Sequence, residues 1–146
     1  MNSDPVDVRA SFTFYPADSR ALRRLTLALR DGGLDVERTD VFRLLLHVTS
    51  ELDMMALATV RLRQEANQPA GDEFVDERFT VTLRPAWLKK LDRAVDELAR
   101  KDVAVRRTFV ARAVVHAEHN VTALARAAEK FFGEFPDRRT RAARPT

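Results

Sequence analysis

The sequence contains no cysteine, and only four glycines and three histidines stand among its 146 residues. The lack of cysteine excludes disulfides, thiolate metal sites and cysteine nucleophiles. So few glycines leave little room for a phosphate-binding loop, and neither a nucleophile–base grouping nor a pair of catalytic carboxylates stands out. His116 and His119 lie three residues apart, but no third ligand stands at a matching spacing. We therefore expect no enzyme, no cofactor, no metal site and no small-molecule substrate.

Long apolar runs are also missing, since no stretch approaches the ~20 residues that a membrane-spanning helix needs. The first residues, Met-Asn-Ser-Asp-Pro, are polar and acidic, unlike a signal peptide. We expect no membrane contact and a cytoplasmic, nucleoid-associated location. The 25 basic residues against 22 acidic ones give a net charge of +3, which permits nucleic-acid binding without establishing it.

What the sequence does contain is an internal repeat. When Pro16 is placed over Pro85, the segments 9–16 (RASFTFYP) and 78–85 (RFTVTLRP) align without a gap. The agreement continues through three further pairs: Leu22 with Leu91, Arg38 with Arg107, and His47 with His116. Two arginine- and alanine-rich helical stretches could agree by coincidence, but the shared segment ahead of the helices weighs against that.

Each copy of the repeat opens with alternating apolar and polar residues, which is typical of a half-buried strand. Pro16 and Pro85 then suit the first turn of a helix, and apolar residues at helical spacing follow them. Gly32 and Gly33 predict the end of this helix in the first copy, whereas Lys101 and Asp102 give no such signal in the second.

Two more helices are predicted in each copy. The second helix should begin near Glu37 or Arg38 in the first copy and near Arg106 in the other. Ser50 and Asn120 have the character of N-caps for the third helices. The apolar stripes of these third helices are Leu52, Met55, Thr59 and Leu62 in one copy and Val121, Leu124, Ala128 and Phe131 in the other.

An isolated strand with one apolar face is unstable, so the two strands should pair and pack that face on the helices. We predict a mainly α fold with one two-stranded antiparallel β-ribbon. The first repeat with its third helix should cover residues 8–63 and the second residues 77–132. Residues 64–76 read as a linker and 133–146 as a basic, disordered tail. The two repeats should form one compact unit.

A strand of alternating Arg, Ser/Thr and apolar residues followed by two amphipathic helices resembles the ribbon-helix-helix family of DNA-binding proteins. The resemblance covers residues 8–48 and 77–117. In that family two copies pair their strands into a ribbon whose polar face enters the major groove. The resemblance therefore implies a tandem pseudo-dimer within one chain, with an extra helix per repeat. This architecture is similar to that of an accessory DNA-binding protein of T-DNA transfer.

Two sets of DNA-contacting residues follow from the resemblance. Base contacts are implied for the polar strand residues Arg9, Ser11, Thr13, Arg78, Thr80 and Thr82, because arginine and hydroxyl side chains can bond base edges. The alternative is a solvated strand face, since threonine favours strands anyway. Phosphate contacts are implied at the start of each second helix, for Arg38, Thr39, Arg106, Arg107 and Thr108.

The sequence departs from the family pattern at these helix starts, where the family usually has Ser or Thr. Glu37 would repel a phosphate and Arg106 would attract one, so the two halves should grip the backbone unequally. The alternative is that Glu37 only complements the helix dipole. The strands also differ, with Ser11 matched to Thr80 and Ala10 to Phe79, which leads us to expect an asymmetric DNA site.

The expected function is sequence-specific binding of double-stranded DNA, as a transcriptional regulator or as a plasmid or conjugative DNA-processing accessory factor, with self-association on DNA left open. The alternative is a protein-interaction module, such as an antitoxin that binds a toxin through its third helices or tail. Burial of Leu52, Met55, Leu124 and Phe131 would favour a core role for the third helices, and a contiguous exposed patch would favour a partner.

Overall fold

The computed structural model describes residues 7–67 and 77–134, which are mainly helical with one two-stranded antiparallel sheet. This coarse prediction of the fold is confirmed. The elements of the first half are β1 (Val8–Phe14), α1 (Pro16–Asp31), α2 (Arg38–Val48) and α3 (Glu51–Ala66). Those of the second half are β2 (Glu77–Leu83), α4 (Pro85–Arg100), α5 (Arg107–His116) and α6 (Val121–Glu134). Residues 64–66, predicted as linker, belong to α3, and Asn67 is its C-cap residue. Residues 133 and 134, predicted as disordered tail, belong to α6. Residues 68–76 and 135–146 lie outside the described residues.

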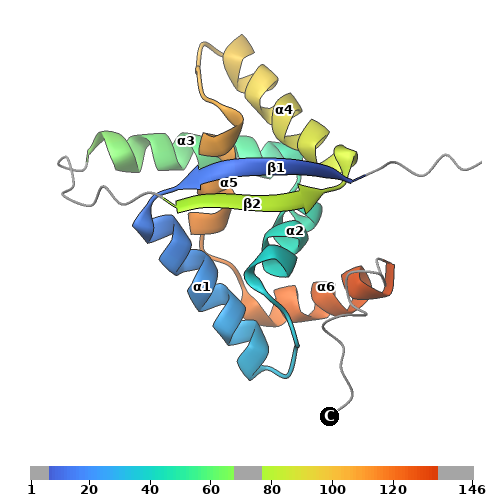
Figure 1. The fold of residues 1–146 in the computed structure, drawn as a ribbon. Helices are drawn as coiled ribbons and strands as arrows, with labels where there is room; N and C mark the ends of the chain where they lie inside the picture. The colour runs from blue at the N-terminus through green and yellow to red at the C-terminus, as the bar shows by residue number, and fades with distance from the viewer. Residues whose placement is uncertain (1–6, 68–76, 135–146) are drawn as a thin grey trace, which may run out of the picture.

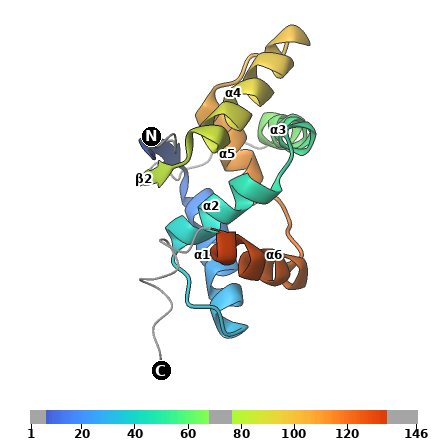
Figure 2. The same cartoon turned by 90° about the vertical axis from the view of Figure 1, so that its right-hand side faces the viewer.

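The ribbon of β1 and β2 lies across one side of the molecule, and the helices lie behind it (Figures 1 and 2). Its inner face is built from the apolar residues of the predicted alternation, and all six are buried: Ala10, Phe12, Phe14, Phe79, Val81 and Leu83. Phe42 of α2 meets this face edge-on, with its ring centroid 5.2 Å from those of both Phe12 and Phe79. Each buried aromatic ring stabilises the fold by roughly 2–3 kcal/mol, so the ribbon is firmly held on its helices.

Helices α1 and α4 end in the same backbone geometry although their sequences differ. Gly33 follows α1 with a φ of 100°, and Asp102, at the matching position after α4, has a φ of 63°. Asp tolerates this left-handed conformation better than most residues with a side chain. Asp102 therefore marks the end of α4, for which the sequence of the second copy gave no signal.

The N-caps of the third helices are confirmed, because Ser50 Oγ accepts a bond from the Asp53 amide (3.0 Å) and Asn120 Oδ1 one from the Ala123 amide (2.9 Å). Their apolar stripes are confirmed only in part. Met55, Leu124, Ala128 and Phe131 are buried. Leu52 is 76% exposed and Val121 is 38% exposed, because both stand in the first turn of a helix, away from its packed face.

A buried ionic cluster joins α1, α3 and α5. Arg112 of α5 bonds the Asp18 carboxylate of α1 at 2.7 Å and also pairs with Glu65 of α3. Burial raises the pKa of Asp18, but the neighbouring His116 and the hydrogen bond and charge of Arg112 outweigh burial, so the pKa lies below its usual value. Asp18 also accepts a bond from the Tyr15 amide (3.0 Å), which places this cluster at the junction of β1 and α1.

Candidate nucleic-acid interface

The outer face of the ribbon carries the six residues predicted to contact bases. Their positions alternate with the buried inner-face residues, and the side chains are exposed or half-buried. The helices all lie on the opposite side of the ribbon, so this polar face is open to solvent (Figure 2). The structure therefore brings Arg9, Ser11, Thr13, Arg78, Thr80 and Thr82 together on one surface.

The strand register arranges these six residues symmetrically. Ser11 lies opposite Thr80, its own equivalent in the repeat, at the centre of the ribbon. On one side of this centre Arg9 lies opposite Thr82, and on the other Arg78 lies opposite Thr13. Each half of the outer face therefore offers one arginine and one threonine, contributed by different strands.

Two contacts orient hydroxyl groups on this face. Ser11 Oγ and Thr80 Oγ1 are 2.9 Å apart and share a hydrogen bond. Arg43 of α2 donates to the Thr82 carbonyl (2.9 Å) and to the Thr82 hydroxyl oxygen (3.1 Å). Because the Thr82 oxygen accepts this bond, its hydroxyl hydrogen is directed elsewhere and can be donated to an outside acceptor.

An open groove of about 790 Å³ runs along β2, between that strand, α1 and the start of α2. We call this side of the ribbon the β2 flank. Arg38, predicted to contact phosphate, lies here, but both of its terminal nitrogens bond Glu77, at 3.0 and 2.7 Å. Its guanidinium also stands 5.3 Å from the Phe79 ring centroid. Thr39 lines the same groove.

Glu77 is held ionised by this arrangement. The hydrogen bond from Arg38 has the largest effect and lowers the pKa of Glu77, whereas burial raises it. A hydrogen bond from Ser19 and the charges of Arg38 and Arg23 lower the pKa further, to about 2. The charge of Arg38 is therefore neutralised at neutral pH by a carboxylate 39 residues away in sequence.

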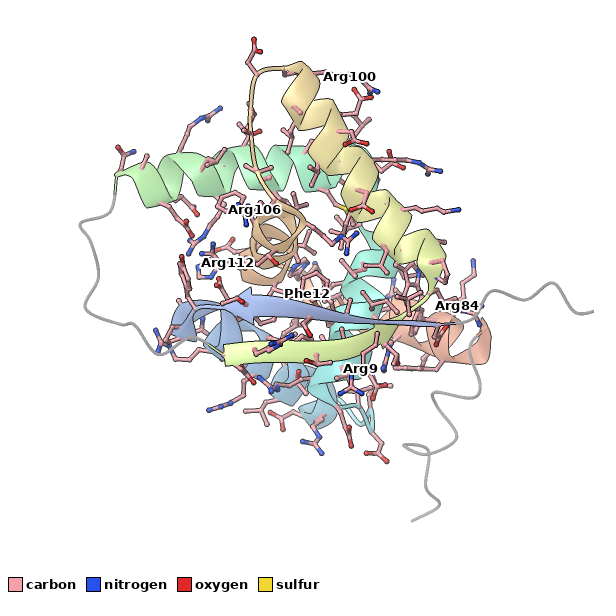
Figure 3. All side chains as sticks on the ribbon, turned by 45° about the horizontal axis from the view of Figure 1, so that its top comes forward. Arg9, Phe12, Arg84, Arg100, Arg106 and Arg112 are labelled. Atoms are coloured by element: carbon pink, nitrogen blue, oxygen red, sulfur yellow. The ribbon has the colours of Figure 1, made fainter. Side chains whose placement is uncertain are left out.

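The start of α5 lies on the opposite side of the ribbon, above β1 in Figure 1, and we call this side the β1 flank. Arg106 is the N-cap residue of α5, and its exposed side chain has no hydrogen-bond or ion-pair partner within residues 7–67 and 77–134. Figure 3 shows it at the near end of that helix. Arg107 bonds both carboxylate oxygens of Asp92, at 2.8 and 2.9 Å, and Thr108 is half-buried.

Two further arginines of the β2 flank were not predicted. Arg23 and Arg30 of α1 are exposed and line the groove, and neither has a hydrogen-bond or ion-pair partner in the part of the chain that the structure describes. Their spacing of seven residues, two helical turns, is a sequence signal that they share one face of α1. The sequence could not show that this face adjoins the ribbon.

Within the described residues, no group of three metal-ligating side chains comes together. His116 instead faces Asp18, with 3.5 Å between its Nδ1 and Oδ1 of the carboxylate, and His119 bonds the Val114 carbonyl at 2.8 Å. None of the described helices combines the length and apolar character needed to cross a membrane.

Comparison of the chain with protein-family models, curated proteins and solved structures finds no match.

Proposed function

We propose that this chain binds double-stranded DNA in a sequence-specific manner, with the outer face of the β1–β2 ribbon in the major groove. The observation that carries this proposal is the outer face itself: six polar residues aligned in a symmetric register on a ribbon whose inner face is fixed on helices. In this proposal the chain is a tandem ribbon-helix-helix pseudo-dimer with an extra helix per repeat.

The dimensions and chemistry of the ribbon suit the major groove. That groove is about 12 Å wide and admits a two-stranded ribbon, and its base edges present distinct donors and acceptors. Arginine can bond O6 and N7 of guanine together, and threonine offers both a hydroxyl and a methyl group. The symmetric register adds that the two halves of the ribbon present the same residue types to the DNA.

The unequal strands led us to expect an asymmetric DNA site, and in this proposal the asymmetry is limited to the central base pairs. Ala10 and Phe79 are buried on the inner face, so their difference does not reach the DNA. Ser11 and Thr80 differ, but they lie at the centre of the ribbon. The outer base pairs of the site should therefore form an inverted repeat, with any asymmetry of base readout confined to the centre.

A DNA-binding protein of this kind acts without catalysis, as a transcriptional regulator or as a plasmid or conjugative accessory factor near the nucleoid. The alternative, a protein-interaction module, draws support from the exposure of Leu52 (76%) and Val60 (46%) on α3. Burial of Met55, Leu124 and Phe131 favours a core role for the third helices and thus the DNA-binding function.

The test is selection of bound fragments from a random duplex library at near-physiological salt, followed by sequencing. A short enriched motif is the expected result. Arg78→Ala and Thr82→Ala should each weaken discrimination at particular base pairs by ~1–3 kcal/mol. Arg100→Ala is the matched control, because Arg100 lies at the far end of α4 from the ribbon (Figure 3). Strand variants that select the same motif as wild type would rule out the ribbon as the reading surface.

A further inference from the structure

The two flanks of the ribbon carry opposite charges at equivalent positions of the repeat. Arg23 of α1 corresponds to Asp92 of α4, and Glu37 before α2 corresponds to Arg106 before α5. At these positions the positive charge therefore lies on α1 at the β2 flank, and just before α5 at the β1 flank.

Ion pairs within each flank determine which arginines keep a charge without a carboxylate partner. Arg107 is bound by Asp92 at the β1 flank, where Arg106 keeps its charge unpaired within the described residues. Arg38 is bound by Glu77 at the β2 flank, and Glu37 adds a further negative charge to the groove. Among the described residues, the other arginines that line this groove without a hydrogen-bond or ion-pair partner are Arg78, on the ribbon itself, and Arg23 and Arg30 of α1.

We infer that Arg23 and Arg30, rather than Arg38, bind the DNA backbone at the β2 flank. This inference rests on the proposed function, because it requires the ribbon to lie in the major groove. A ribbon in that groove has one sugar–phosphate strand on each side, and the groove along β2 is where one of these strands would pass. At the β1 flank the corresponding contact falls to Arg106.

The chemistry of the groove fits a phosphodiester. The guanidinium of arginine binds phosphate oxygens bidentately and is weakly hydrated, so little is lost on binding. Both side chains are exposed and reach the groove from one helix face. Glu77 keeps Arg38 in place at the wall of the same groove, since its carboxylate stays ionised at neutral pH. Arg38 then forms part of the groove wall, and its charge is not available to bind a phosphate.

The experiment measures duplex binding of Arg23→Gln and Arg30→Gln by fluorescence anisotropy over a series of salt concentrations. The duplex carries the motif selected by the wild-type chain. Each variant should bind about tenfold more weakly. Each should also lower the slope of log affinity against log salt by about 0.9, the contribution of one phosphate contact. The base preference should be unchanged, since neither arginine lies on the ribbon.

Arg24→Gln is the matched control. Arg24 is exposed on the same helix and the change removes the same charge, but it lines two other grooves, with residues of α5, away from β2. Its affinity and salt slope should equal those of wild type. Equal losses in Arg23→Gln and Arg24→Gln would reduce the effect to overall charge and overturn the inference.

A second readout locates the contact on the DNA. Replacing single phosphates by uncharged methylphosphonates should weaken wild-type binding at two positions of the backbone strand beside β2. One of these positions should have no added effect in Arg23→Gln, and the other should have no added effect in Arg30→Gln. If Arg78→Ala changes base preference while the α1 variants bind as wild type, the inference fails and the proposed function stands. If the wild-type chain binds no duplex, both fail.

Discussion

Ser11 of β1 lies opposite Thr80 of β2, and their hydroxyl oxygens share a hydrogen bond of 2.9 Å. The two residues are 69 positions apart, which is also the spacing of the internal repeat. Each is therefore paired with its own equivalent, and the symmetry axis of the strand register passes between them. Residues two positions away are then placed in like pairs, Arg9 with Thr82 and Arg78 with Thr13.

This register predicts the symmetry of the DNA site. The outer base pairs of a selected motif should form an inverted repeat, because each half of the ribbon presents one arginine and one threonine. Ser11→Thr makes the central residues alike and should affect only the central base pairs in the same library selection. A motif whose outer halves are unrelated in sequence would contradict the register-based reading.

Removing the carboxylate of Glu77 should strengthen DNA binding. Glu77→Gln leaves Arg38 with its charge uncompensated beside the groove, where it can bind a phosphate in addition to Arg23 and Arg30. The salt slope should steepen by about 0.9, as expected for one added phosphate contact. The control is Glu97→Gln, because Glu97 pairs with Arg100 far from the ribbon. An unchanged slope in Glu77→Gln would mean that Arg38 cannot reach the backbone.

Asp18→Asn should be strongly destabilising. The change leaves Arg112, whose side chain is 6% exposed, without its fully buried carboxylate partner, and breaking a buried pair in this way costs about 3–5 kcal/mol. Asp92→Asn removes a partner of exposed Arg107 and should cost only about 0–1 kcal/mol. Urea unfolding of the two variants gives both free energies of unfolding. Equal losses would show that the Asp18 cluster contributes no more than a surface ion pair.

Stability should fall in acid because two carboxyl groups have lowered pKa values in the folded chain. Arg38 and Ser19 hold the pKa of Glu77 at about 2 against burial, and His116 and Arg112 outweigh burial to lower that of Asp18. A lowered pKa stabilises the fold above the ordinary carboxyl pKa of about 4, and this contribution is lost as the pH falls through the folded value.

Urea unfolding between pH 7 and pH 2 tests this expectation. The free energy of unfolding should stay level down to about pH 5 and then decline. The decline should be shallower in Glu77→Gln, by an amount on the order of 1 kcal/mol because the side chain is partly exposed. A decline as steep as that of wild type would mean that the Arg38–Glu77 pair contributes nothing to acid sensitivity.

Two substitutions distinguish a core role of the third helices from a binding role. Phe131 is 1% exposed and its ring packs against Trp87 (5.7 Å) and His47 (5.1 Å). Phe131→Ala should therefore cost about 3–5 kcal/mol in urea unfolding. Leu52→Ser should change stability by less than about 0.5 kcal/mol, because Leu52 is exposed. Weaker DNA binding by Leu52→Ser would instead indicate that α3 takes part in recognition or self-association.

Local pattern in the sequence predicted a large part of the fold. Alternation in the two strands identified which residues face outward, Pro16 and Pro85 marked the first turns of α1 and α4, and Ser50 and Asn120 were correctly predicted as N-caps. These features depend on residues a few positions apart, so the sequence is enough to specify them. For the candidate site, the location of the six outer-face residues was predictable in this way, while their contact with bases stays a prediction.

The state of each charged side chain was decided by tertiary structure. Arg38 and Glu77 are 39 residues apart, and only the packing of the start of α2 against the start of β2 brings them together. The side chain of Arg38, predicted to contact phosphate, is thereby bound to Glu77. Packing likewise places α1 along the ribbon groove, which gives Arg23 and Arg30 their position. The sequence determined which faces are apolar and which are polar; the tertiary structure decided which charges meet, because ion pairs form between elements that are distant along the chain.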